Sequence, residues 1–275
     1  MSDMFKPACG SHSLLETVFF VQFAPEIDLE VMPQLGDKLQ SIHQFLPNRS
    51  SVSAVKIELR PEAQQVSSLQ ATGWQFARTS PEGDTEWLLR FMPDGLSIHC
   101  LAYTRWDEVW PIAEKALVES LKVLPSGVGL NAIGLKAIDR FEYAGEDLAM
   151  YQLDALIRRN SPHIADRVFS AGHRWHCNSG WFVSIPAFGR EMNDREALNQ
   201  INVSGGPISG PAGEQTFVTI DHNQVVKGGI AINPAEHGWL GPVMKKMHKD
   251  NIVVLSEILV DYMIRRINLT VKAEA

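Results

Sequence analysis

Hydrophobic and polar residues are ordered most clearly in the middle of the chain, where they predict two strands, a helix and a further strand. The segments 87–92 (WLLRFM) and 96–103 (LSIHCLAY) have the apolar and β-branched composition of strands. The Pro-Asp-Gly sequence at 93–95 predicts a turn, because proline fixes φ and glycine tolerates a positive φ. Helical spacing follows over 104–124, and 130–143 (LNAIGLKAIDRFEY) is predicted to be a strand.

The predicted helix has one apolar face. Its residues recur every three or four positions: Trp106, Val109, Trp110, Ala113, Leu117 and Leu121. Aromatic residues at this spacing usually fill a core, so core packing is favoured over a cofactor site. We expect the two tryptophans to hold the helix on the sheet and Pro111 to kink it.

Similar patterns occur on both sides of this region. In the first part they predict strands at 14–23, 55–59 and 74–79 and a helix at 28–42. In the second part they predict a helix within 143–160 and a hairpin that turns at Asn178-Ser179-Gly180. They also predict strands at 198–203, 216–221 and 225–232, with a glycine-proline loop at 204–213 and a turn at Asn223. A helix from Pro242 to Ile267 is predicted to end the fold.

These elements predict an α+β protein built from two antiparallel β-meander halves, each followed by a long helix packed on the sheet. We expect a flexible leader at 1–12, an N-terminal half at 13–145 and a C-terminal half at 146–275. The halves can equally form one continuous unit. A duplication would explain the shared order of elements, but no repeat of individual residues supports it.

The last predicted helix is apolar nearly all round from 252 to 264. Such a helix must be covered on more than one side. Either it passes between two sheets or it contacts another chain. In the second case Ile252, Leu255, Leu259 and Met263 would form the interface, through which the chain self-associates or binds a protein partner.

Composition limits the class of protein. Of 275 residues, 45% are hydrophobic and 21% are charged, which is typical of globular proteins. The net charge of −7 disfavours nucleic-acid binding, since phosphate is repelled unless basic residues cluster. The three cysteines, Cys9, Cys100 and Cys177, are too few and too scattered for a disulfide framework. With no apolar N-terminal segment and no run long enough to span a bilayer, we expect a cytoplasmic protein without membrane contact.

Three segments resemble one protein family. They are ETVFFVQFAPEIDLE (16–30), LRFMPDGLSIHCLAYTRWDEVWPI (89–112) and NAIGLKAIDRF (131–141). They look like the opening strand, the Ser-Pro-Asp and Tyr-x-x-Trp motifs and the Ile-Gly-Leu-Arg-Tyr-Ile-Asn-Arg strand of the sporadically distributed family of uncharacterised bacterial and archaeal proteins of about this length. The resemblance covers the first half well and the second half only by layout.

The resemblance implies a prokaryotic protein of a mobile locus, of the defence or toxin–antitoxin type, and implies no activity. The chain departs from the family pattern at Lys136-Ala137, where the family has Arg-Tyr, and at Asp139, where it has Asn. If those family side chains serve a shared ligand, this chain binds a different ligand or none.

Two sets of side chains could bind a ligand or a metal. His173, His176 and Cys177 could ligate a metal only if a turn at Gly172 brings them together, because neighbouring strand residues face opposite ways. Lys136 and Arg140 share a strand face and could receive an anionic group, and His99 is a further ligand-binding candidate. The alternative for all of these residues is an ordinary solvated or salt-bridged surface, and we expect no cofactor.

One set could carry acid–base catalysis. Asp221-His222 and Glu236-His237 each place a carboxylate beside an imidazole, and converging loops could unite them. No phosphate-binding loop, HExxH or GxSxG sequence is present. We therefore expect a non-catalytic binding or assembly protein rather than an enzyme. The alternative is a hydrolase-like enzyme with its site between the two halves.

Overall fold

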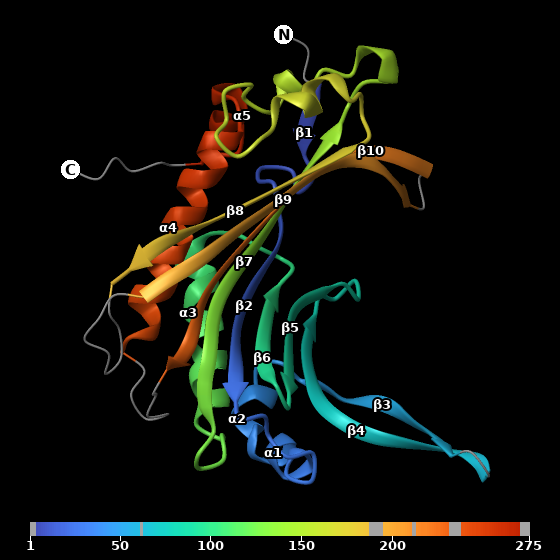
Figure 1. Cartoon of the computed structure of the whole chain (residues 1–275), viewed down its shortest axis with the longest axis vertical. Coiled ribbons are helices and arrows are strands. Elements are labelled where there is room, and N and C mark those ends of the chain that lie inside the picture. The colour runs from blue at the N-terminus through green and yellow to red at the C-terminus, as the bar shows by residue number, and fades with distance from the viewer. Residues whose placement is uncertain (1–3, 61–62, 187–194, 211–212, 231–237, 270–275) are drawn as a thin grey trace.

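The computed structural model describes residues 4–60, 63–186, 195–210, 213–230 and 238–269. They form a ten-stranded sheet in which β3-β4-β5-β6-β2-β7-β10-β9-β8 lie in that order and β1 also pairs with β7 (Figure 1). The strands are β1 Phe5–Pro7, β2 Leu14–Ala24, β3 Asn48–Arg60, β4 Ala63–Thr79, β5 Thr85–Met92, β6 Gly95–Cys100, β7 Gly129–Tyr143, β8 Trp175–Ile185, β9 Arg195–Gly210 and β10 Gly213–Ile230. Every pairing is antiparallel, so the α+β class is confirmed.

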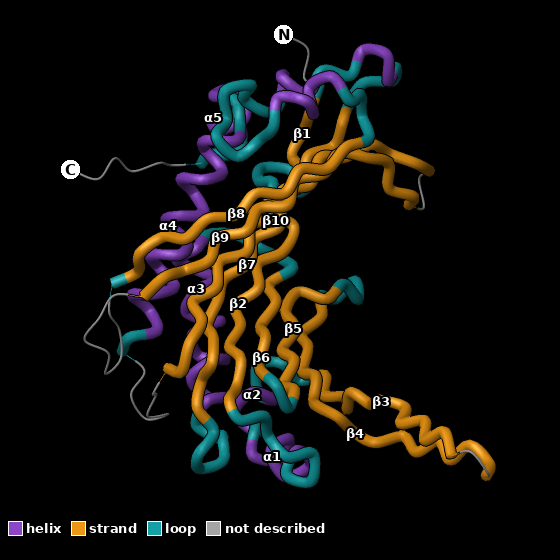
Figure 2. Tube along the Cα trace, viewed as in Figure 1, coloured by secondary structure: helices purple, strands orange, loops and turns teal. Residues whose placement is uncertain are grey.

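The α-helices lie on one face of this sheet (Figure 2). They are α1 Met32–Lys38, α2 Gln40–His43, α3 Trp106–Leu121, α4 Leu240–Ile258 and α5 Asp261–Arg266. Two clusters of buried side chains fill the space between the layers, one beneath α1 to α3 and the start of α4, the other beneath the end of α4 and α5. In the described part of the chain, no helix is long and apolar enough to cross a bilayer.

Strand alternation gives the sheet two different faces. On β2, Phe19 and Val21 are buried against the helices, whereas Glu16 and Gln22 point the other way. On β6, Leu96, Ile98 and Cys100 are likewise buried, while Ser97 and His99 are half-buried on the opposite side. We call the side without helices the open face.

An aromatic stack joins α3 to its neighbours, as the spacing of the tryptophans predicts. The Trp106 and Trp110 rings are parallel with centroids 5.6 Å apart, and His248 of α4 stacks on Trp106 at 4.0 Å. Phe19 of β2 contacts both indoles at 5.8 and 5.6 Å. The stack therefore ties both long helices to the centre of the sheet.

Several predicted boundaries are wrong, and tertiary pairing explains most of them. Residues 178–180 are not a turn, because β8 runs through them and pairs without a break with β9. Asn223 is not a turn residue but lies inside β10, and most of the predicted loop at 204–213 belongs to β9. Hydrogen bonding between neighbouring strands outweighs local turn preference at all three places.

In place of the helix predicted within 143–160, the chain forms short 3₁₀ turns, η1 Leu148–Met150 and η2 Leu153–Ala155. A third 3₁₀ turn, η3 Asp166–Ser170, follows. The few apolar residues of the predicted helix are too short a run to support a cooperative helix. The predicted last helix is interrupted at Leu259, whose extended backbone forms a bridge with Ile157. Arg158 Nε donates to the Leu259 carbonyl at 2.6 Å and holds the chain in this break.

Candidate functional site

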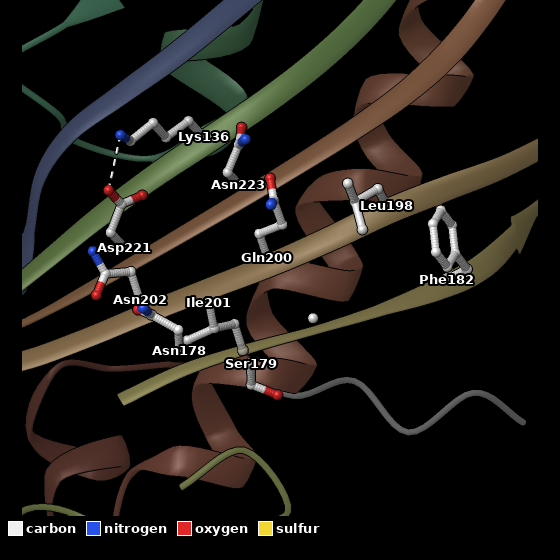
Figure 3. Close-up of a pocket in the computed structure, with 11 residues that line it drawn as sticks. Lys136, Asn178, Ser179, Phe182, Leu198, Gln200, Ile201, Asn202, Asp221 and Asn223 are labelled. Carbon is white, nitrogen blue, oxygen red and sulfur yellow. Dashed lines mark ion pairs between the residues drawn. The ribbon is translucent and has the colours of Figure 1, made fainter. Parts of the chain in front are cut away.

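The open face carries a shallow pocket of about 600 Å³ over β7, β8, β9 and β10 (Figure 3). Its polar lining consists mainly of four amide side chains, Asn178, Gln200, Asn202 and Asn223. Phe182 and Leu198 lie at one end, and the Phe182 side chain is 64% exposed. An exposed aromatic ring beside unpaired amides is a common arrangement at ligand sites.

Strand register places the amides side by side. Asn178 pairs with Asn202, and Gln200 pairs with Asn223. Within the described part of the chain, none of the four side-chain amides forms a hydrogen bond with another residue. Each amide can therefore offer both a donor and an acceptor to a ligand.

The other end of the pocket is an ion pair. Lys136 Nζ on β7 lies 2.8 Å from Asp221 Oδ2 on β10, and Asn202 and Asn223 are the cross-strand neighbours of these residues (Figure 3). Both side chains are about one-quarter to one-third exposed, at 34% and 24%. The pair cancels its own charge, so it offers hydrogen-bonding atoms without a net charge.

A second arrangement lies on the same face, across β2 and β6. Ser97 Oγ is 2.9 Å from His99 Nε2, and His99 Nδ1 is 2.6 Å from Glu16 Oε1. The hydrogen bond with His99, the largest cause, lowers the pKa of Glu16 below its ordinary value. Arg90 on β5 is the direct cross-strand neighbour of Ser97. A hydroxyl, an imidazole and a carboxylate in this order resemble a nucleophile, its base and the group that orients the base.

The two arrangements are close in the sheet. Asn223 pairs with Lys136, Lys136 with Val18, and Val18 with His99. Neighbouring strands are about 4.8 Å apart, so His99 lies roughly 10 Å from Lys136 across β2. One extended ligand could contact both.

Of the predicted acid–base set, the structure describes Asp221 and His222, and these two side chains diverge. Asp221 and His222 are consecutive on β10, so Asp221 lies on the open face and His222 beneath the helices. Asp221 and His222 therefore cannot act together on one ligand from the same side of the sheet. Glu236 and His237 lie outside the described residues.

Both ring nitrogens of the buried His222 are hydrogen-bonded to side chains inside the protein. Its Nε2 lies 2.9 Å from Asn199 Oδ1, and Asn251 Nδ2 of α4 lies 3.0 Å from its Nδ1. Burial, followed by the charge of His163, lowers the pKa of His222 to about 4. A neutral imidazole that donates through Nε2 and accepts through Nδ1 satisfies both partners.

The predicted metal ligands also diverge. His176 is exposed on the open face, whereas Cys177 lies on the other side, with its Sγ 3.8 Å from the His163 carbonyl. His173 precedes the strand, and its ring is 6.4 Å from that of Tyr151. Among the residues that the structure describes, no three His, Cys, Asp or Glu side chains are grouped to hold a metal ion.

Lys136 and Arg140 share the open face, as the alternation of β7 predicts. Lys136 is paired with Asp221, and Arg140 Nε lies 3.4 Å from Thr219 Oγ1 with its guanidinium 5.6 Å from the Phe217 ring. His99 contributes to the Ser97 arrangement. The predicted anion site is thus occupied at Lys136 by a carboxylate of the chain itself.

The predicted interface on the last helix needs correction. Leu255, Leu259 and Met263 are buried in the second hydrophobic cluster of the chain itself, and only Ile252 is half-buried. The interruption at Leu259 turns the chain, so that α4 and α5 both pack their apolar residues inward. These three residues are therefore not available to a partner.

Sequence reasoning did not find the amide set or Ser97. The signal for Ser97 is its i, i+2 spacing from His99, which places both on one strand face. The amides carry the same signal, because Gln200 and Asn202 also alternate along one strand. Predicting a turn at 178–180 and another at 223 hid the remaining two amides.

The protein-family models and the curated proteins contain no match to this chain.

Proposed function

We propose that the chain is a non-catalytic binding protein that holds an uncharged, hydroxyl-rich ligand, such as a small saccharide, in the pocket on the open face. The observation that carries this proposal is the group of four amides without internal hydrogen bonds beside the exposed Phe182 ring. Amides donate and accept, as hydroxyl groups do, and an aromatic ring can pack on the apolar face of a sugar.

Charge favours a neutral ligand. Lys136 is already neutralised by Asp221, and the whole chain carries a net charge of −7. A phosphate or carboxylate group would have to displace Asp221 and overcome the negative field. Neutral hydroxyl groups meet neither obstacle.

The test is a calorimetric titration with a panel of neutral mono- and disaccharides, with nucleosides and nucleotides as separate arms. Gln200→Ala and Asn223→Ala should each weaken saccharide binding about five- to tenfold, the effect of losing one hydrogen bond of about 1 kcal/mol. Gln75→Ala is the matched control, since it removes an amide elsewhere in the sheet and should change nothing. Preference for nucleotides, or no binding by any arm, would contradict the proposal.

A second candidate is a hydrolase-like enzyme, which the Ser97–His99–Glu16 arrangement favours. In such an enzyme Ser97 Oγ attacks an acyl carbon and its proton passes to His99 Nε2. The leaving group takes that proton as its bond breaks, and water then releases the acyl group from Ser97. Glu16 orients the imidazole, and Arg90 is the cation placed to stabilise the oxyanion.

Labelling with a fluorophosphonate probe separates this candidate from simple binding. The hydrolase requires labelling of Ser97 that is lost in Ser97→Ala and strongly reduced in His99→Ala, together with turnover of activated esters. Ser204→Ala, which changes another serine of the open face, serves as the control. Labelling that is equal in wild type and Ser97→Ala would remove the hydrolase.

We also propose that the two predicted meander halves derive from a duplication. In support, β2 and β7 pair with each other at the centre of the sheet, and each is flanked by three consecutive strands on its other side. The strands β4, β5 and β6 follow one another inward to β2, and β8, β9 and β10 follow one another in the same way to β7. The Glu16–His99 and Lys136–Asp221 pairs then occupy equivalent diagonal positions. An experimental structure with either register shifted by two residues would contradict this equivalence.

The place of the protein in a prokaryotic mobile locus of the defence or toxin–antitoxin type is a proposal that depends on the family resemblance alone. The test is to delete the gene that encodes this chain, alone and together with its neighbouring genes, and to compare the phenotypes. Independent phenotypes would count against it.

A further inference from the structure

The strand β8 lies at one end of the sheet, and no described strand pairs with its outer side. It is 11 residues long and pairs with β9 in an unbroken register. Over residues 175–183, the outer backbone N–H and C=O groups of such a strand can form a template for another strand.

β8 lacks the features that protect natural sheet edges. Its sequence, WHCNSGWFVSI, contains no lysine, arginine, aspartate, glutamate or proline. Its pairing shows no bulge, and Phe182 is 64% exposed beside the edge. Charges, prolines and bulges are the devices that keep edges from pairing.

The opposite edge, β3, differs in these respects. Its sequence, NRSSVSAVKIELR, includes two arginines, a lysine and a glutamate, and its pairing with β4 is shifted at two places. Of the two outermost strands in the described sheet, β8 is therefore the one whose sequence and pairing lack these protective features.

We propose that β8 pairs antiparallel with β8 of a second copy of this chain around a twofold axis. The occupant is a second copy because an uncharged strand can pair with itself without bringing like charges together. Such an isologous contact pairs the β8 edges of both copies with each other. The edges that remain in the described sheet are the two protected β3 strands, so the assembly stops at a dimer. The pockets of the two copies, each lined by Asn178 and Phe182 of its own β8, then lie side by side across the axis.

Sedimentation velocity and light scattering over a concentration series test this directly. The expected mass is twice 30.6 kDa. Phe182→Lys should raise the dissociation constant of the dimer at least about tenfold, because a lysine on an edge strand opposes pairing. Asn178→Lys should act in the same direction, and it keeps the test open if the first variant does not fold.

Val253→Lys is the control, because Val253 is a 44% exposed apolar residue that lies on α4 and not on β8. It should leave the dimer intact. Added salt should strengthen the dimer by screening the repulsion between two chains of net charge −7. None of these readouts requires a ligand, so they are independent of the proposed function.

Two results would overturn the proposal. One is a wild-type chain that stays monomeric up to its solubility limit. This result includes the case in which β8 pairs with a peptide of another protein and not with a second copy. The other is a dimer that resists both β8 lysine variants and is dissociated by Val253→Lys.

Discussion

Single side chains on the helix-covered face of the sheet are under different constraints from those on the open face. Asp139 of β7 is fully buried, and its Oδ1 accepts a hydrogen bond from Ser13 at 2.6 Å. Burial raises the pKa of Asp139 to about 6, against an opposing effect of the Ser13 hydrogen bond. Its charged form is therefore disfavoured in the folded protein.

This position gives a prediction about stability and pH. Because the folded pKa of about 6 exceeds the ordinary value of 3.8, the folded state binds the extra proton in that window and stability falls as pH rises through it. Asp139→Asn should add on the order of 1 to 3 kcal/mol to the free energy of unfolding at pH 7.5 and little at pH 4. Urea unfolding at both values measures this. A variant that is less stable at pH 7.5 would show that the ionised carboxylate has a favourable partner.

At the scale of elements, the aromatic stack fixes both long helices. Trp106 lies between Trp110 and His248, so it contacts α3, α4 and Phe19 of β2 at once. Burial within this stack lowers the pKa of His248 to about 4, with a smaller opposing effect of Asp107. The uncharged imidazole ring can then stack on the Trp106 indole as an apolar aromatic ring does.

Removal of the central ring should loosen both helices. Trp106→Ala is expected to reduce the free energy of unfolding by about 3 kcal/mol, in the range for large-to-small changes at packed sites. Val253→Ala on exposed α4 surface should change it by less than about 0.5 kcal/mol. Urea denaturation followed by circular dichroism compares the two. Similar losses for both variants would mean that the stack is not a main support of the helices.

The elements also show what sequence can predict. Strand alternation correctly predicts that Leu96, Ile98 and Cys100 of β6 lie on one buried face. It also correctly predicts that Lys136 and Arg140 of β7 share a face. The passage of β8 through Asn178-Ser179-Gly180 does not, because its pairing partner lies about twenty residues further along the chain and local turn preference points elsewhere. The break at Leu259 depends in the same way on a distant residue, Ile157.

At the scale of the whole molecule, the two faces of the sheet carry different groups. The helix-covered face holds both hydrophobic clusters and the neutral His222 network. The open face carries the amide pocket, the Lys136–Asp221 pair and the Ser97–His99–Glu16 arrangement. This difference between the faces is the basis for proposing that a ligand binds on the open face.

The separation of the faces can be measured by methyl NMR during titration with the saccharide panel. Leu198, Ile138 and Val225 project from the open face, whereas Val203 and Ile220 lie beneath the helices. We predict shifts at the first three methyl groups and none at the last two. Shifts concentrated at Val203 and Ile220, or none at any concentration of any ligand in the panel, would contradict the assignment of binding to the open face.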